Sequence, residues 1–127
     1  SLPARWLVNL RNFLSQPNAL GDGAFAYSVR AVGLLATPSL DDPSGLWIEP
    51  CNSVHTLGMR YPIDLAFVRA DGTVAKVVPQ VVPWRLAGCR GARSTLELRA
   101  GLAAELGLVP GSRLHLAEEA HQPEDAS

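Results

Sequence analysis

The chain has 127 residues, of which 47% are hydrophobic and 18% charged, and this balance predicts one globular domain rather than a disordered chain. No apolar run reaches the roughly 18 residues of a membrane helix, and the first residues lack the apolar run of a signal peptide, so we expect a cytoplasmic protein without membrane contact. The formal net charge of −1 excludes a strongly basic nucleic-acid-binding domain.

The first two predicted elements are a strand and a helix. Residues 5–13 nearly alternate apolar and polar side chains, which predicts a strand. Residues 24–35 place Phe25, Val29 and Val32 at helical spacing, which predicts a short helix with one apolar face.

The middle of the chain predicts a β-hairpin. Residues 46–49 are a short strand, and residues 63–68 and 73–78 are two further strands. The turn between the last two contains Asp71-Gly72, the dipeptide that tight hairpins favour. Pro79 and Pro83 then break the pattern, so Val81-Val82 is expected at a sheet edge.

The C-terminal third predicts two strands around a second short helix. Residues 94–98 alternate as a strand, residues 100–106 form a two-turn helix that Gly107 ends, and residues 113–116 form the last strand. Between them, Val109-Pro110-Gly111-Ser112 has the pattern of a type II turn. The fold class is therefore α+β and mainly β: a compact antiparallel β barrel or sandwich with two short helices, about 24–35 and 100–106.

We expect this domain to span residues 1–116 and an acidic, disordered tail to follow over residues 117–127. The tail holds four of the 12 acidic groups and no Lys or Arg, which leaves 8 acidic against 11 basic groups in the domain. That excess of about +3 is scattered, so no nucleic-acid partner is expected. Cys51 and Cys89 are too few for a disulfide scaffold; we expect reduced thiols, with a bridge between the two as the alternative.

A series of short motifs appears in order along the chain. They are Gly33-Leu34-Leu35, Gly45-Leu46, Pro50-Cys51-Asn52-Ser53-Val54-His55-Thr56, Met59-Arg60-Tyr61-Pro62-Ile63-Asp64, Phe67, Asp71-Gly72, Pro83-Trp84-Arg85, Leu96-Glu97-Leu98-Arg99-Ala100-Gly101 and Gly107-Leu108-Val109-Pro110-Gly111. This series resembles the bacterial and archaeal family catalogued as domain of unknown function 192, over roughly residues 24–116. The resemblance implies a bacterial origin and a mainly β fold with short helices, and it leaves activity, substrate and cofactor unassigned.

The residues from Cys51 to Met59 allow three interpretations: a metal site, an enzyme site, or a purely structural role. A thiolate, an imidazole and a thioether would suit a soft metal such as copper, or zinc, with Cys51 and His55 as ligands. A cysteine- or carboxylate-dependent enzyme would use Cys51, His55 and Asp64. In the third reading these residues pack or bond the backbone. In an extended strand Cys51 and His55 would lie about 13 Å apart, so they meet only if the chain turns.

Asp64 and the Trp84-Arg85 pair are the other candidate site residues. Asp64 enters an apolar strand, and a buried carboxylate requires hydrogen bonds or a cation. Asp64 is expected either to bond backbone N–H groups or an Arg and so fix the loop, or to act as a general acid or base. Trp84 beside Arg85 offers an aromatic plane and a guanidinium group to an anionic or sugar-like ligand, or simply covers one end of the barrel.

The sequence thus favours a binding domain for a small ligand or a partner over an enzyme or a metal site. Its site is bordered by the Cys51–Asp64 loop and by Trp84-Arg85. The predicted ligand-binding residues are Asn52, His55, Thr56, Arg60, Asp64, Trp84 and Arg85. No cofactor and no oligomeric state are assigned.

Overall fold

The computed structural model describes residues 3–12, 26–31, 43–56 and 60–116. The strands in these ranges are β1 (Ala4–Asn12), β2 (Ala26–Ala31), β3 (Ser44–Glu49), β4 (Ser53–His55), β5 (Ile63–Val68), β6 (Val74–Val81), β7 (Leu86–Gly88), β8 (Ser94–Arg99) and β9 (Arg113–Leu116). The helix in these ranges is α1 (Leu102–Leu106). No helix of the described residues is long and apolar enough to cross a membrane.

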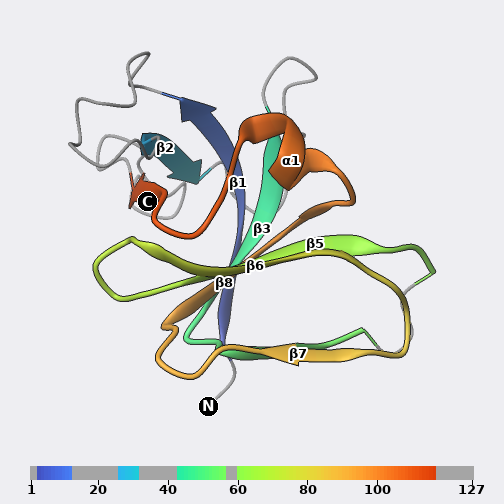
Figure 1. Ribbon diagram of the computed structural model, residues 1–127. Coiled ribbons are helices and arrows are strands. Elements are labelled where there is room, and N and C mark those ends of the chain that lie inside the picture. The colour runs from blue at the N-terminus through green and yellow to red at the C-terminus, as the bar shows by residue number, and fades with distance from the viewer. Residues whose placement is uncertain (1–2, 13–25, 32–42, 57–59, 117–127) are drawn as a thin grey trace, which may run out of the picture.

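Seven strands form one curled sheet in the order β6-β5-β8-β3-β1-β2-β9, a half-barrel (Figure 1). Neighbouring strands are antiparallel except β2 and β9, which are parallel. The curl brings the two edge strands together, because Thr73 pairs with Arg113 and the Leu114 N–H donates to the Gly72 carbonyl over 2.8 Å. Only glycine fits at position 72, where φ is +92° and a Cβ atom would lie 2.5 Å from the Leu114 carbonyl oxygen.

The described residues form two apolar clusters, one on each face of β5. The first lies inside the curl and includes Tyr27, Trp47 and Leu96. The second lies on the outer face, where Leu65 and Phe67 meet a two-stranded ribbon of β4 and β7. All six residues of β5 are buried because each face of the strand is covered. The ribbon is therefore a second layer over the half-barrel.

The predicted helix over residues 24–35 is wrong, because residues 26–31 form strand β2. Tyr27 and Val29 are at most 1% exposed and alternate along β2, and the Tyr27 hydroxyl donates to the Leu106 carbonyl. Five register pairs join β2 to β1, so tertiary pairing overrides the helical spacing. Phe25 and Val32, on which that spacing depends, lie outside the described residues.

The other predicted strands and turns are confirmed within one to three residues. Gly111 has a φ of +98° and the Ser112 N–H donates to Val109, as the type II turn requires. Strand β6 extends through Pro79 to Val81, and it is an edge strand, where proline is tolerated. The sequence did not predict β4 and β7, and the expected tail over 117–127 lies outside the described residues.

Candidate functional site

The motif from Cys51 to Thr56 forms one edge of the ribbon. Val54 pairs with Ala87, and His55 pairs with Leu86. Beyond the ladder, the Cys89 N–H donates to the Asn52 carbonyl and the Cys51 N–H to the Arg93 carbonyl, each over 2.9 Å. The predicted loop is therefore extended at this end and anchored to β7 and to the start of β8.

The structure places Cys51 and His55 in different surroundings. The Cys51 thiol donates to the Ser53 carbonyl over 3.2 Å, whereas His55 is exposed on β4. Both Cys51 and Cys89 are free thiols. Within the described ranges no three His, Cys, Asp or Glu side chains gather to hold a metal ion, and no hydrogen bond joins Cys51 to His55. Neither the enzyme nor the soft-metal reading gains support there, and Met59 lies outside those ranges.

Thr56 ties the ribbon to the turn that carries Trp84. Its side chain is 1% exposed, and its hydroxyl donates to the Val82 carbonyl and accepts the Arg85 N–H, each over 2.8 Å. Its backbone N–H donates to the Arg85 carbonyl, and its carbonyl accepts the Trp84 N–H. Thr56 thus fixes residues 82–85 from inside the molecule.

Trp84 and its neighbours form an exposed surface that we call the ribbon-end surface. Trp84 has a φ of +68°, which is rare for a bulky residue, and its side chain is 67% exposed. The Arg85 guanidinium group donates to the Trp84 carbonyl over 3.3 Å. Four of the five exposed large apolar side chains of the described residues lie at this end; the fifth, Val109, lies in the turn before β9. The ribbon-end surface comprises Arg60, Tyr61, Val82, Trp84, Arg85 and Leu86.

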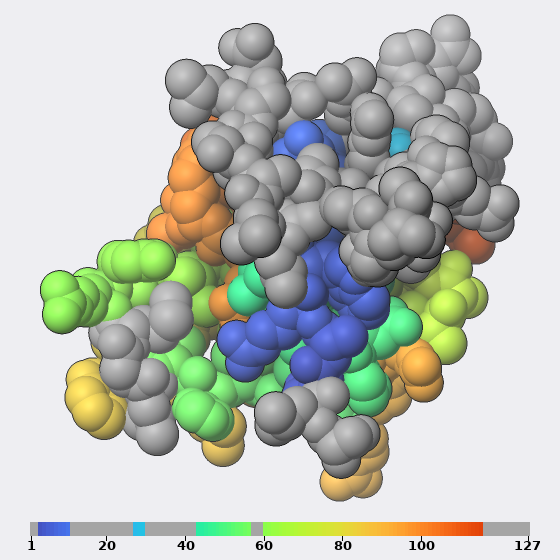
Figure 2. Space-filling view, turned by 180° about the vertical axis from the view of Figure 1, so that it is seen from behind, coloured from blue at the N-terminus to red at the C-terminus, as the bar shows by residue number. Residues whose placement is uncertain are grey.

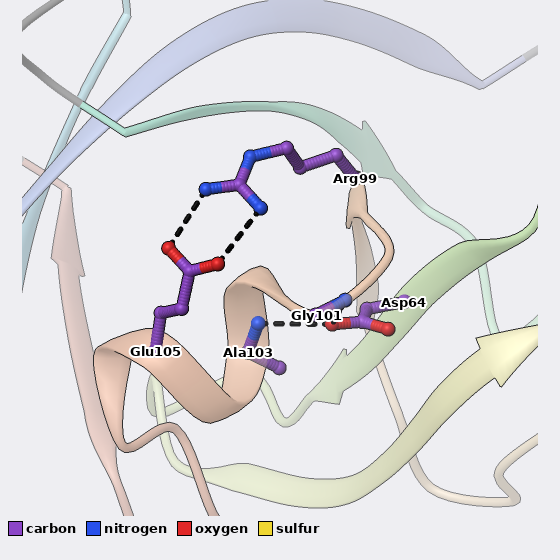
Figure 3. Close-up of polar contacts among 5 residues, drawn as sticks. All are labelled: Asp64, Arg99, Gly101, Ala103 and Glu105. Atoms are coloured by element: carbon purple, nitrogen blue, oxygen red, sulfur yellow. Dashed lines mark hydrogen bonds and ion pairs between the residues drawn. The ribbon is translucent and has the colours of Figure 1, made fainter.

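Asp64 is a structural anchor inside β5. It is fully buried, and one carboxylate oxygen accepts the N–H groups of Gly101 and Ala103 over 3.0 and 2.9 Å (Figure 3). These groups belong to the first turn of α1, which no side chain at its own N-cap satisfies. The other oxygen accepts the Gln80 N–H over 2.8 Å.

That third hydrogen bond holds a β-bulge. The register between β5 and β6 shifts between Ile63 and Leu65, and Gln80 there has a φ of +52°. Asp64 thereby joins the bulge of one edge strand to the start of the helix. Of the two readings of Asp64, the hydrogen bonds match the backbone-binding one.

The described hollow beside Cys51 does not extend to Trp84. Its volume is about 440 Å³, and it is lined by Pro50, Cys51, Asn52, Ala70 and residues 91–93. Trp84 and Arg85 lie at the opposite end of the ribbon, beside His55 and Thr56. The structure therefore places Asn52 in the hollow beside Cys51. His55, Arg60, Trp84 and Arg85 lie together at the opposite end of the ribbon.

A second hollow, which we call the barrel mouth, lies outside the site that the sequence predicted. Its volume is about 300 Å³ and its polar lining is Glu49, Arg69, Asp71, Arg93, Ser94 and His115. The Glu49 carboxylate accepts the Ser94 hydroxyl over 2.6 Å and the Trp47 indole N–H over 3.2 Å. The sequence offers one local indication of this hollow, because Glu49 directly precedes the Pro50-Cys51 motif. The contact with Ser94 could not be predicted, since the two residues are 45 positions apart.

The family model of domain of unknown function 192 (DUF192), described as an uncharacterized ACR, matches residues 24–116. The chain belongs to the DUF192 family. The match covers β2 to β9 of this DUF192 domain, with the ribbon, Asp64 and the barrel mouth, whereas β1 precedes it.

Two solved structures resemble this DUF192 domain. One is a protein of unknown function from Novosphingobium aromaticivorans, 26% identical, with a TM-score of 0.50 over 69% of this chain and 71% of that one. The other is a putative transcription regulator from Sinorhizobium meliloti, 21% identical, with a TM-score of 0.57 over 89% of this chain and 94% of that one. The second shows a shared fold alone. A search of curated proteins gives no significant match.

Proposed function

We propose that this DUF192 domain is a binding module and that its ribbon-end surface recognises an acidic, partly apolar segment of a partner protein. The observation that carries the proposal is Trp84. A positive φ at a bulky residue costs on the order of 1–3 kcal/mol, and such strain gathers at functional positions. Thr56 stabilises this backbone while the indole stays 67% exposed, so the turn presents Trp84 to something outside the chain.

The composition of the surface matches that of protein-binding sites. Trp, Tyr and Arg are the residues that most often dominate binding energy, and here they stand beside exposed Val82 and Leu86. The apolar side chains of this surface are 43–77% exposed, so an extended partner suits it better than an enclosed small molecule.

The positive charge of the ribbon-end surface favours an acidic partner. Residues 50–63 and 72–96 contain Arg60, Lys76, Arg85, Arg90 and Arg93 and no Asp or Glu. Of these, Arg60 and Arg85 lie exposed on the ribbon-end surface, which is therefore positively charged. Complementary charge would speed association with acidic segments and fix their register. We also propose that the domain works in a reducing compartment such as the cytosol, which would suit its two free thiols.

A display selection of random 12-residue peptides on the intact chain tests this proposal. We expect enriched peptides to carry Asp or Glu around an aromatic or Leu residue, and to bind more weakly as salt rises. Trp84→Ala and Arg85→Ala should each weaken binding about tenfold or more, as loss of a central contact does. Val109→Ala, at an exposed apolar residue elsewhere, should leave binding unchanged. Enriched peptides that bind the Trp84→Ala variant as well as the parent chain would overturn the proposal.

A small anionic or sugar-like ligand is the second candidate, and the guanidinium group of Arg85 beside Trp84 favours it. Glucuronate and glucose serve as the small-ligand probes, and a DNA duplex serves as the nucleic-acid probe. Glucuronate binding that requires both Trp84 and Arg85, with no peptide enriched, would replace the first candidate by the second. Binding of the duplex alone would contradict both.

A further inference from the structure

The barrel mouth lies at the opposite end of the molecule from the ribbon-end surface. The β5–β6 turn, the end of β3, the start of β8 and part of β9 surround it, and Figure 2 shows the first three together at the right edge. Ile63 pairs with Val81 near one end of β5, and Val68 pairs with Val74 at the other. The five residue steps from Ile63 to Val68, at about 3.3 Å each, separate the two regions by roughly 16 Å. A ligand in the barrel mouth would therefore be independent of a partner at Trp84.

The floor of the barrel mouth is apolar and belongs to the inner core cluster. Trp47 and Leu114 line it and are each 4% exposed, because both belong to the inner core cluster. The Trp47 indole N–H is already bound to Glu49. The floor therefore supplies shape and a dry surface, and the polar rim supplies the groups that would orient a ligand.

The two carboxylate oxygens of Glu49 differ: Oε1 accepts two hydrogen bonds, and Oε2 has only an ion pair among the contacts described. Oε1 accepts both the Ser94 hydroxyl and the Trp47 indole N–H. Oε2 lies 3.7 Å from the Arg93 guanidinium nitrogen, an ion pair that is longer than a hydrogen bond. The Glu49 side chain is 28% exposed and lines the hollow, so a ligand N–H group that bonds Oε2 would leave the two donors on Oε1 in place.

Two arginines are held on the same rim by their backbones. The Arg93 N–H donates to Val68 and its carbonyl accepts the Cys51 N–H, while the Arg69 N–H donates to Thr73. Both side chains are exposed. Guanidinium groups bind carboxylates in a two-pronged geometry, which fixes an anionic group more firmly than a lysine would.

The charges of the rim balance one another. Arg69 and Arg93 oppose Glu49 and Asp71, and a hydrogen bond from the Thr73 N–H lowers the pKa of the Asp71 carboxyl, so that it stays charged at neutral pH. A simple anion would meet two carboxylates there, and a simple cation would meet two guanidinium groups. The complementary ligand carries both charges.

We propose that the barrel mouth binds a small zwitterion of the α-amino acid class, with its carboxylate on Arg69 and Arg93 and its ammonium group on Glu49. The volume of about 300 Å³ is at the small end of ligand sites and suits a molecule of this size. The hollow beside Cys51, which shares Arg93 and Ala70 with the barrel mouth, gives room for the ligand's side chain.

The test uses the full chain labelled with ¹⁵N and the twenty common amino acids as probes. We expect at least one of them to shift the indole N–H signal of Trp47 at millimolar concentration and to leave that of Trp84 unchanged. Its methyl ester, which lacks the carboxylate charge, and its hydroxy acid, which lacks the ammonium group, should bind at least tenfold more weakly. No shift of the Trp47 signal by any amino acid, or equal binding of either analogue, would overturn the proposal.

Two variants separate binding from folding. Glu49→Gln keeps the acceptor for Trp47 and Ser94 but removes the negative charge, so it should retain the thermal midpoint within a few degrees and weaken amino acid binding at least tenfold. Glu105→Gln, an exposed acidic residue on α1, should bind as the parent chain does. Parent-like binding by Glu49→Gln would contradict the assignment. Failure of the chain to bind peptides at Trp84, by contrast, would not affect the proposal for the barrel mouth.

Discussion

Asp64 joins two elements, because its carboxylate accepts N–H groups from the β6 bulge and from the first turn of α1. Asp64→Asn leaves a single acceptor oxygen and no charge, so we expect the free energy of unfolding to fall by about 2–4 kcal/mol. Urea denaturation measures this change. Asp71→Asn, at an exposed carboxylate that also accepts a backbone N–H, should cost clearly less, and equal costs would show that Asp64 is no anchor.

Thr56 is the second residue whose role the hydrogen bonds define. Thr56→Val keeps the shape of the side chain but leaves the Arg85 N–H and the Val82 carbonyl without this partner, so we expect a loss of about 1–3 kcal/mol in the free energy of unfolding. Thr56→Ser retains the hydroxyl and should cost less. The same denaturation curves, followed by fluorescence, test both variants. If the Val variant were as stable as the Ser variant, the hydroxyl hydrogen bonds of Thr56 would not stabilise the Trp84 turn.

At the scale of elements, β8 carries a carboxyl group between two apolar strands. Glu97 lies opposite Leu65 on β5 and Leu46 on β3, and burial raises the pKa of its carboxyl, an effect that the nearby Arg5 partly offsets. The folded state therefore holds this proton more tightly than the unfolded state, and stability falls as the pH rises from the ordinary value of 4.5 through the raised one.

Glu97→Gln removes that loss and should unfold at a higher temperature than the parent chain at pH 7, with the difference disappearing below pH 4.5. Glu105→Gln should act in the opposite direction at pH 7, since the hydrogen bond from Arg99 lowers the pKa of Glu105. Thermal melts of the three proteins between pH 4 and 8 check both signs. Shifts in the same direction for the two variants would contradict this assignment.

Local patterns predicted the elements whose side chains act within a few residues of one another. The Asp71-Gly72 hairpin, the Gly107 helix end and the Gly111 turn each depend on one or two backbone angles, and all three are present. Strand β2 was missed because its pairing with β1 and β9 outweighs a helical spacing. The ribbon was missed because three-residue strands carry little pattern of their own.

In the candidate site, too, contacts between neighbours in the sequence were predictable and contacts between distant residues were not. Cys51, His55 and Asp64 drew attention as rare or buried residue types, yet spacing along the chain says nothing of what surrounds them. Asp64 is satisfied by Gln80, Gly101 and Ala103, of which the nearest is 16 residues away. Glu49 reaches Ser94 across 45 residues. Trp84-Arg85 was recognisable because its two groups are adjacent in sequence.

At the scale of the whole molecule, the half-barrel and its ribbon separate two surfaces of different chemistry. The ribbon-end surface is exposed, apolar and basic, whereas the barrel mouth is concave and balanced in charge. Trp84 reports on the first and Trp47 on the second, so one spectrum of the labelled chain observes both. The indole signals can be assigned with Trp6→Phe and Trp84→Phe.

Titration of the ¹⁵N-labelled chain with the tightest acidic peptide from the display selection tests the central claim most directly. We predict that the Trp84 indole signal and the backbone amides of residues 84–86 shift progressively and saturate, while the Trp47 signal stays in place. The shifts should shrink as salt screens the charges of Arg60 and Arg85. A peptide that binds while the Trp84 signal does not move would contradict the claim that the ribbon-end surface is the binding site.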